Sequence, residues 1–217
     1  MKRYEAVIFD WDGTVMDSTH SIVEAIQSAC ADVDLPIPET STASWVIGLS
    51  LESALYHCVP TLSAEQLPLF LERYRHHFLR RDPEIKLFDG IIDLLDTLRQ
   101  RAVTLGVATG KSRVGLERVL SAKKLHRYFD TTRCADESFS KPHPGMLLEI
   151  TEELGLSPER LLMVGDTSHD IQMATSAGID SMAVTYGAHD KSTLLEAEPT
   201  VMVSSVGEMQ AWILARV

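Results

Sequence analysis

The sequence has few cysteines and few basic residues, and each shortage excludes a class of protein. Its three cysteines, Cys30, Cys58 and Cys134, are widely spaced and form no Cys-x-x-Cys pair, so they indicate neither a disulfide framework nor a zinc site. Lys and Arg number 20 against 31 Asp and Glu, a formal net charge of -11. Because a nucleic-acid binder needs a basic face, we expect no nucleic-acid partner.

Long hydrophobic runs are also missing. The apolar run from Ala6 to Phe9 stops at Asp10, which is too short for a signal-peptide core or a membrane span. We therefore expect a cytoplasmic protein with no membrane partner. With 217 residues, 45% of them hydrophobic, the chain can form one sizeable α/β core that carries a smaller inserted domain. No sequence pattern decides between a monomer and a homodimer.

Short apolar runs alternate with helical patterns, which is typical of βαβ units and a parallel sheet. The predicted strands are Ala6–Phe9, Thr104–Ala108, Leu161–Val164 and Ser181–Thr185, with weaker candidates at Thr131–Cys134 and Thr200–Val203. The helices expected to cover this sheet are Asp89–Arg101, Val114–Leu125, Pro144–Leu154 and Ser168–Ala177. In the first of them, one apolar stripe is expected to pack on the sheet: Ile92, Leu95 and Leu98.

The segment from Asp17 to Ile85 breaks this alternation. It contains no convincing strand and three predicted helices, Ser18–Val33, Leu51–Cys58 and Ala64–Arg81. Only two chain crossings would join it to the rest of the protein, as a hinged lid requires. We expect a core domain made of residues 1–16 and 86–217, with a small helical cap domain, residues 17–85, inserted into it.

The first predicted strand runs into Asp10-Trp11-Asp12-Gly13-Thr14. Ligands of open α/β sheets bind at this carboxyl edge of the strands. Asp10 can attack phosphorus as a nucleophile, and Asp12 is close enough to hand a proton to the leaving oxygen. Gly13 lets backbone amides approach a phosphate. The alternative is an ordinary Asp-Gly turn at a strand end.

The second long strand runs into Thr109-Gly110-Lys111-Ser112. Thr109 can donate a hydrogen bond to a phosphate oxygen. The alternative is that Thr109 or Ser112 only caps the helix that follows. Lys111 is a tempting phosphate ligand, but a lysine in a turn is usually solvated, and we expect that here.

A proline-flanked loop, Lys141-Pro142-His143-Pro144, precedes a predicted helix. Such a stiff loop can aim the ammonium group of Lys141 in one direction, at Asp10 and at phosphate oxygens that would otherwise repel each other. The alternative is a surface lysine beside a helix start. We expect His143 to be a loop residue and not a catalyst.

The third strand end carries Asp166 and Asp170, four residues apart. Magnesium is bound by a few oxygen ligands and keeps several waters, so Asp10, Asp166 and the backbone carbonyl of Asp12 would suffice as its protein ligands. Asp170 would not bind the metal directly but would orient a water molecule that does. The alternative is that Asp166 or Thr167 caps the next helix.

The four patterns occur in order, each after a strand or before a helix, and their residue types complement one another. In this the sequence resembles the haloacid dehalogenase superfamily, whose four motifs match Asp10–Thr14, Thr109, Lys141-Pro142 and Gly165–Asp170. The resemblance implies a Rossmann-like parallel sheet in the order 5-4-1-2-3, flanked by helices, and a helical cap of type 1. Two segments are most similar to the phosphoglycolate phosphatase-like branch: Asp12–Ser18 and Gly48–Leu51.

The resemblance also implies a reaction in two steps that both need Mg²⁺. Asp10 attacks phosphorus and Asp12 protonates the alcohol that leaves; Asp12 then activates water, which hydrolyses the phospho-aspartate. Thr109, the Gly110 amide and Lys141 stabilise charge on the transferred group. The expected substrate and partner is a small phosphorylated metabolite, a phosphate monoester similar to phosphoglycolate.

Other branches of the superfamily fit the sequence less well. Dehalogenases lack the second carboxylate and the metal site, and phosphonatases need a cap lysine, whereas no lysine occurs between Lys2 and Lys86. Phosphomutases place basic residues near Gly48, where Val46–Leu49 is apolar. That apolar loop also offers no partner for a phosphoglycolate carboxylate. Other residues of the cap segment could donate to it, but a solvated helix face or a structural role is the more typical interpretation of them: Arg73, Arg75, His57, His76 and His77. Open alternatives are a pyrophosphatase, a nucleotidase and a sugar phosphatase. A non-catalytic phosphate sensor is a further alternative, but the presence of both Asp10 and Asp12 argues against it.

Overall fold

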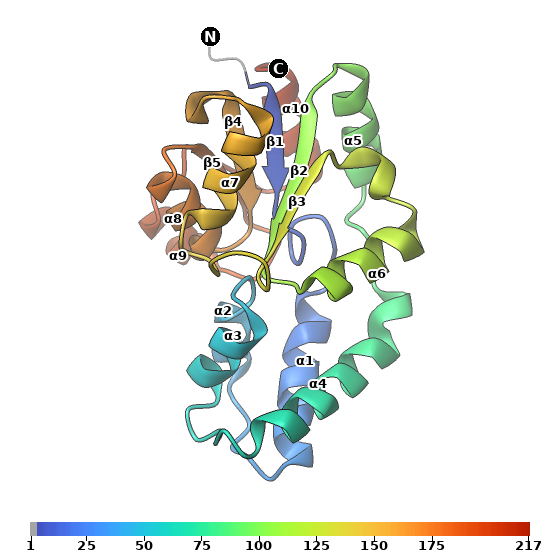
Figure 1. Ribbon diagram of the computed structural model, residues 1–217, viewed down its shortest axis with the longest axis vertical. Coiled ribbons are helices and arrows are strands. Elements are labelled where there is room, and N and C mark those ends of the chain that lie inside the picture. Colours follow the sequence, from blue (N-terminus) through green and yellow to red (C-terminus); the bar gives the residue numbers. More distant parts are fainter. Residues whose placement is uncertain (1–3) are drawn as a thin grey trace.

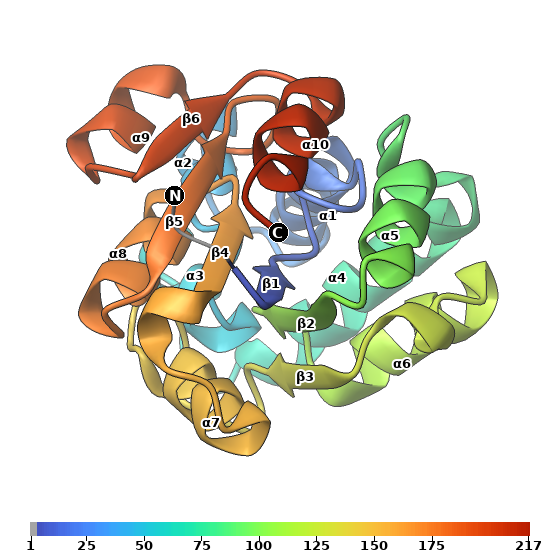
Figure 2. The same cartoon turned by 90° about the horizontal axis from the view of Figure 1, so that it is seen from above.

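The computed structural model describes residues 4–217 and contains a parallel six-stranded sheet in the order β3-β2-β1-β4-β5-β6 (Figures 1 and 2). The first five strands follow the predicted order 5-4-1-2-3, and β6 extends the sheet beside β5. Both weaker candidates are therefore strands. The strands are β1 (Ala6–Phe9), β2 (Thr104–Thr109), β3 (Thr131–Cys134), β4 (Leu161–Gly165), β5 (Asp180–Val184) and β6 (Val201–Val203).

Helices cover both faces of the sheet (Figure 2). In β1, Val7 and Phe9 pack into one core and Ala6 and Ile8 into another, since successive side chains of a strand point to opposite faces. The first face is covered by α5 (Ile91–Gln100), α6 (Arg113–Lys123) and α10 (Val206–Leu214). The second is covered by α7 (Gly145–Leu154), α8 (Ser168–Ser176) and α9 (Lys191–Glu196).

Helix α5 lies on the sheet with a different stripe from the predicted one. Ile92 is 37% exposed, so its assignment to the packed stripe was wrong. The buried residues are Ile91, Leu94, Leu95 and Leu98, whose spacing of three, one and three residues defines a single helical face. Sequence periodicity alone did not separate the neighbours Ile91 and Ile92.

Residues 17–85, called the insertion below, are helical and lie beyond the carboxyl ends of the strands (Figure 1). The helices are α1 (Thr19–Asp32), α2 (Thr40–Trp45), α3 (Leu51–Cys58) and α4 (Leu67–Arg81), followed by the 3-10 turn η1 (Asp82–Glu84). Helix α2 was not predicted, because its sequence Thr-Ser-Thr-Ala-Ser-Trp is short and rich in weak helix formers. The two chain crossings pair with each other, since the Asp17 amide donates to the Lys86 carbonyl at 2.9 Å.

Two further 3-10 turns, η2 (His126–Tyr128) and η3 (Pro158–Arg160), lead into β3 and β4. Over residues 4–217, every helix is too short or too polar to cross a bilayer.

Candidate active site

Asp10 follows β1 directly and is buried at the carboxyl edge of the sheet, with 1% of its surface exposed. Its Oδ1 accepts a hydrogen bond from the Lys141 ammonium at 2.6 Å. Its Oδ2 is buried and has no hydrogen-bond partner among the described residues. Burial raises the pKa of Asp10 to about 7 against the attraction of Lys141, and repulsion from Asp170 and Asp12 adds to the rise.

Lys141 lies between two carboxylates and is not a surface lysine. Its ammonium is also 2.7 Å from Asp170 Oδ1, and no part of its side chain is exposed. Burial opposes the charge of Lys141, but the attraction of Asp10 and Asp170 outweighs it and raises the lysine pKa. One cation thus holds together two anions, one directly after β1 and the other in the first turn of α8.

Asp166 follows β4 and faces Asp10 from the neighbouring strand. Its Oδ1 accepts from the Thr14 hydroxyl at 2.9 Å and its Oδ2 from the Ala188 amide at 2.7 Å. Burial raises the pKa of Asp166 well above its usual range, and repulsion from Asp10 and Asp170 adds to it. Gly13 is needed here because it has a φ of 84° and a side chain at this position would collide with Asp166.

Asp170 has two roles at once. Its Oδ2 accepts from the Thr167 amide at 3.1 Å, and the Thr167 hydroxyl accepts in turn from the Asp170 amide at 3.3 Å, which completes a capping box at the start of α8. The capping alternative is therefore right for Thr167. The same side chain uses its Oδ1 for the ion pair with Lys141, so capping does not remove Asp170 from the site.

The residues at this point fit a divalent cation. Asp10, Asp166 and Asp170 each offer one carboxylate oxygen, and these oxygens lie within 4.8 Å of one another. Lys141 pairs with Asp10 and Asp170 but not with Asp166, and over residues 4–217 Asp10 Oδ2 has no hydrogen-bond partner. Hard oxygen ligands with excess negative charge are the set that Mg²⁺ prefers, and a cation there would relieve the repulsion.

Asp12 points to a different set of partners, where the core meets the insertion. The Ser18 hydroxyl donates to its Oδ1 at 2.5 Å, and the Lys111 ammonium lies 3.0 Å from its Oδ2. The Lys111 side chain is only 10% exposed, and its ammonium stands 5.0 Å from the ring centre of Phe78 in α4. The expectation of a solvated Lys111 was wrong, because a carboxylate and an aromatic face remove it from water.

Thr109 ends β2 and is buried beside these groups, with 1% exposed. Its hydroxyl accepts from the Lys111 amide at 3.2 Å. Ser112, and not Thr109, caps α6, because the Ser112 hydroxyl accepts from the Gly115 amide at 3.3 Å. Gly110 lies against the Gly48 carbonyl of the insertion so closely that a Cβ could not be accommodated.

Contacts that the sequence did not predict join the insertion to the core. The carbonyl of Trp45 lies 2.9 Å from Nε2 of His169 and 2.9 Å from Nε2 of His189. The Ser50 amide donates to the Ser140 hydroxyl at 2.8 Å, in the loop of Lys141. Backbone carbonyls and amides carry no mark in a sequence, and helix α2, which ends at Trp45, was itself not predicted, so no sequence signal pointed to these bonds.

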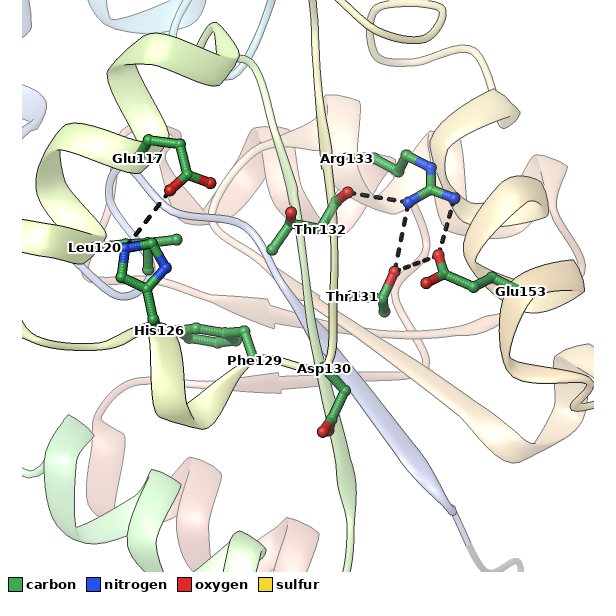
Figure 3. A pocket seen from close by; sticks show the side chains of 9 residues that line it. All are labelled: Glu117, Leu120, His126, Phe129, Asp130, Thr131, Thr132, Arg133 and Glu153. Atoms are coloured by element: carbon green, nitrogen blue, oxygen red, sulfur yellow. Dashed lines mark hydrogen bonds and ion pairs between the residues drawn. The ribbon is translucent and has the colours of Figure 1, made fainter.

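A surface hollow of about 320 Å³ lies away from these residues, along the edge strand β3 (Figure 3). Its polar groups pair with each other: Arg133 reaches Glu153 at 2.9 Å, and Thr131 donates to Glu153 at 2.7 Å. A second hollow of about 460 Å³ lies between α1 and α4 around His77 and Arg81. None of the predicted site residues lines either hollow.

Comparisons with known proteins identify the family of the chain. The family of haloacid dehalogenase-like hydrolases matches residues 7–184. The chain is 35% identical over 209 residues to the Probable phosphatase IndB of Dickeya dadantii, which covers 94% of this chain and 90% of the relative. It is 28% identical over 207 residues to the Phosphoglycolate phosphatase of Mannheimia succiniciproducens, covering 91% of this chain and 92% of that one.

A solved structure gives the same result for the fold. The crystal structure of a predicted phosphatase from Clostridium acetobutylicum superposes with a TM-score of 0.86 and 28% sequence identity, over 99% of this chain and 100% of the other. The chain belongs to the haloacid dehalogenase-like hydrolase family and is one of its phosphatases, a phosphoric monoester hydrolase.

Proposed function

We propose that this protein is a Mg²⁺-dependent phosphatase that hydrolyses a small phosphate monoester through a phosphorylated Asp10. The observation that carries the proposal is the state of Asp10: one oxygen is fixed by Lys141 at 2.6 Å, and the other is buried without a hydrogen-bond partner among the described residues. A carboxylate held in this way is oriented for attack and shielded from water.

In the first step, a carboxylate oxygen of Asp10 attacks phosphorus and the bond from phosphorus to the ester oxygen breaks. Asp12 gives its proton to that oxygen, so the product leaves as a neutral alcohol. In the second step, Asp12 takes a proton from water, the water oxygen attacks phosphorus, and the bond to Asp10 breaks. Inorganic phosphate leaves, and both aspartates return to their starting states.

Four groups from three loops would stabilise the transferred phosphoryl group. Lys141 places a buried positive charge next to Asp10, and the Thr109 hydroxyl ends the neighbouring strand. The Gly110 amide and the backbone amides of the turn before Gly13 complete the set of donors, while the Gly13 amide itself donates to the Met16 carbonyl at 2.8 Å. Fixed donors aimed at a developing charge need no reorganisation during the reaction, which is why such arrangements lower barriers.

Mg²⁺ would be held by the carboxylates of Asp10 and Asp166 and by the backbone carbonyl of Asp12, and Asp170 would orient the water ligands of the ion. When bound, the ion would neutralise negative charge on the phosphate oxygens. The oxygen cluster and the raised pKa values of Asp10 and Asp166 support this assignment.

The insertion, residues 17–85, would act as a cap that closes over the leaving group, on a core of residues 1–16 and 86–217. Its Gly48 carbonyl lies on Gly110, and two paired crossings connect it to the core. We favour a phosphoglycolate-like substrate because the relative from Mannheimia succiniciproducens carries that name. Pyrophosphate, nucleoside monophosphates and sugar phosphates are the alternatives, and we place the reaction in the cytoplasm.

The test is a phosphate-release assay of the purified protein with 2-phosphoglycolate, pyrophosphate, a nucleoside monophosphate and a sugar phosphate. We expect turnover of at least one compound with Mg²⁺ and none with EDTA. Equal turnover in EDTA would contradict the role of the metal. Turnover of pyrophosphate alone would exclude a monoester as the substrate.

A further inference from the structure

Lys111 has contacts that the proposed reaction does not use. Its ammonium lies 3.0 Å from Asp12 Oδ2, it is nearly buried, and it stands over Phe78 of the insertion. The Ser18 hydroxyl occupies the other Asp12 oxygen at 2.5 Å. Both oxygens of the acid–base residue are therefore engaged, one of them by a cation.

The ammonium group of Lys111 can bind a further acceptor. It has three donor hydrogens, and the carboxylate of Asp12 is the one that pairs with it among the described residues. An anion of the substrate that lies beside Asp12 would therefore meet a cation that is already nearly buried and oriented.

The leaving group is where such an anion would lie, since Asp12 must reach the ester oxygen. The other nearby cations are engaged: Lys141 holds Asp10 and Asp170, and Arg118, which lies 6.0 Å from the ring centre of Phe78, is paired with Asp82. Lys111 is anchored on the core and faces the insertion, so it lies at the boundary that a leaving group would occupy.

We propose that Lys111 determines specificity by binding an anionic substituent of the leaving group, a carboxylate or a second phosphate close to the ester oxygen. The inference rests on the proposed function and deepens it. It also supplies the partner for a substrate carboxylate that the apolar segment Val46–Leu49 does not provide.

Two esters of similar size test this proposal: 2-phosphoglycolate, which carries a carboxylate, and 2-hydroxyethyl phosphate, which carries a hydroxyl. The wild type is expected to prefer phosphoglycolate in kcat/KM. In Lys111→Met this value should fall about 10- to 100-fold for phosphoglycolate, the range of a hydrogen bond between charged groups, and by less than about threefold for the hydroxyl ester. Lys111→Arg should keep most of the preference.

Lys191→Met is the matched control, because Lys191 is an exposed lysine at the start of α9 and its loss changes the net charge equally. The same comparison with pyrophosphate as the substrate shows whether a second phosphate can take the place of the carboxylate. An equal fall of kcat/KM for pyrophosphate in Lys111→Met would mean that Lys111 binds both kinds of anion.

An equal loss for both esters in Lys111→Met would overturn the proposal, since Lys111 would then only position Asp12. A wild type without preference for the carboxylate would overturn it as well. If the wild type releases phosphate from neither ester, the proposed function fails separately. The preference is then measured by calorimetric binding of the two esters to the wild type and Lys111→Met, and equal affinities in the wild type would refute the role of Lys111.

Discussion

The surroundings of Asp10 and of Asp12 belong to one site but are built differently. Asp10 pairs with Lys141, which pairs in turn with Asp170, and these three side chains have 1% or less of their surface exposed. Asp12 lies at the boundary between core and insertion, where its side chain and that of Lys111 are 11% and 10% exposed. Phe78 from α4 completes this boundary.

The difference separates two tasks. The buried centre keeps charges in one arrangement, which suits the phosphoryl group that every substrate shares. The arrangement of the boundary depends on the position of the insertion relative to the core, and an adjustable boundary suits a leaving group that differs between substrates. Substitutions in the centre should therefore affect all substrates alike, whereas those at the boundary should affect them unequally.

The largest expected effect distinguishes the two aspartates directly. Asp10→Asn should lower kcat by at least about 10⁴-fold for every ester, because no nucleophile remains. Asp12→Asn should release one nitrophenolate per enzyme from p-nitrophenyl phosphate in a rapid burst and then stall, since this leaving group needs no proton but the hydrolysis of the phosphoenzyme does. Stopped-flow absorbance measures the burst. A burst from Asp10→Asn would contradict the division of roles.

The next effect concerns the stability of the buried centre. Lys141→Met leaves Asp10 and Asp170 without their cation, and the free energy of unfolding in EDTA should fall by about 3–5 kcal/mol. Urea denaturation measures this loss. Lys111→Met at the more exposed boundary should cost less than about 1 kcal/mol. Similar losses for the two variants would remove the contrast between centre and boundary.

A smaller effect follows from the titration of Asp10. Its pKa is raised from 3.8 to about 7, so between these values the folded protein binds more protons than the unfolded one, and the wild type loses stability as the pH rises. Asp10→Asn does not titrate. The free energy of unfolding of Asp10→Asn minus that of the wild type should therefore increase as the pH rises towards 7. The increase should be at most about 1.4 kcal/mol per pH unit.

Urea denaturation in EDTA at several pH values measures this trend, and Asp89→Asn, at an exposed position, serves as the control. A difference between Asp10→Asn and the wild type that stays constant over the whole range would contradict the raised pKa.

The smallest effect concerns closure of the insertion. Ser140→Ala removes the acceptor of the Ser50 amide, a bond of 2.8 Å between insertion and core. Loss of one such bond, about 1 kcal/mol, should raise KM about fivefold and leave kcat nearly unchanged. Steady-state kinetics tests this. A large fall in kcat at constant KM would place Ser140 in the chemistry instead of in closure.

The centre was predictable from the sequence and the boundary was not, for physical reasons. Asp10 and Asp166 each follow a buried strand and Thr109 ends one, so the parallel sheet alone brings them to one edge. Lys111 lies in the loop after β2, and its position depends on Phe78, which is 33 positions away in helix α4, so no local pattern encodes that contact. The same holds for the Trp45 carbonyl, because a backbone acceptor can belong to any residue.

The most direct test of the account is to trap the covalent intermediate. Wild-type protein is mixed with Mg²⁺ and its best substrate, quenched in acid within milliseconds, digested and analysed by mass spectrometry. We predict the added mass of one phosphoryl group on the peptide that contains Asp10, and none in Asp10→Asn. Rapid phosphate release without any phosphorylated peptide, or with the label on another residue, would contradict the assignment of Asp10 as the nucleophile.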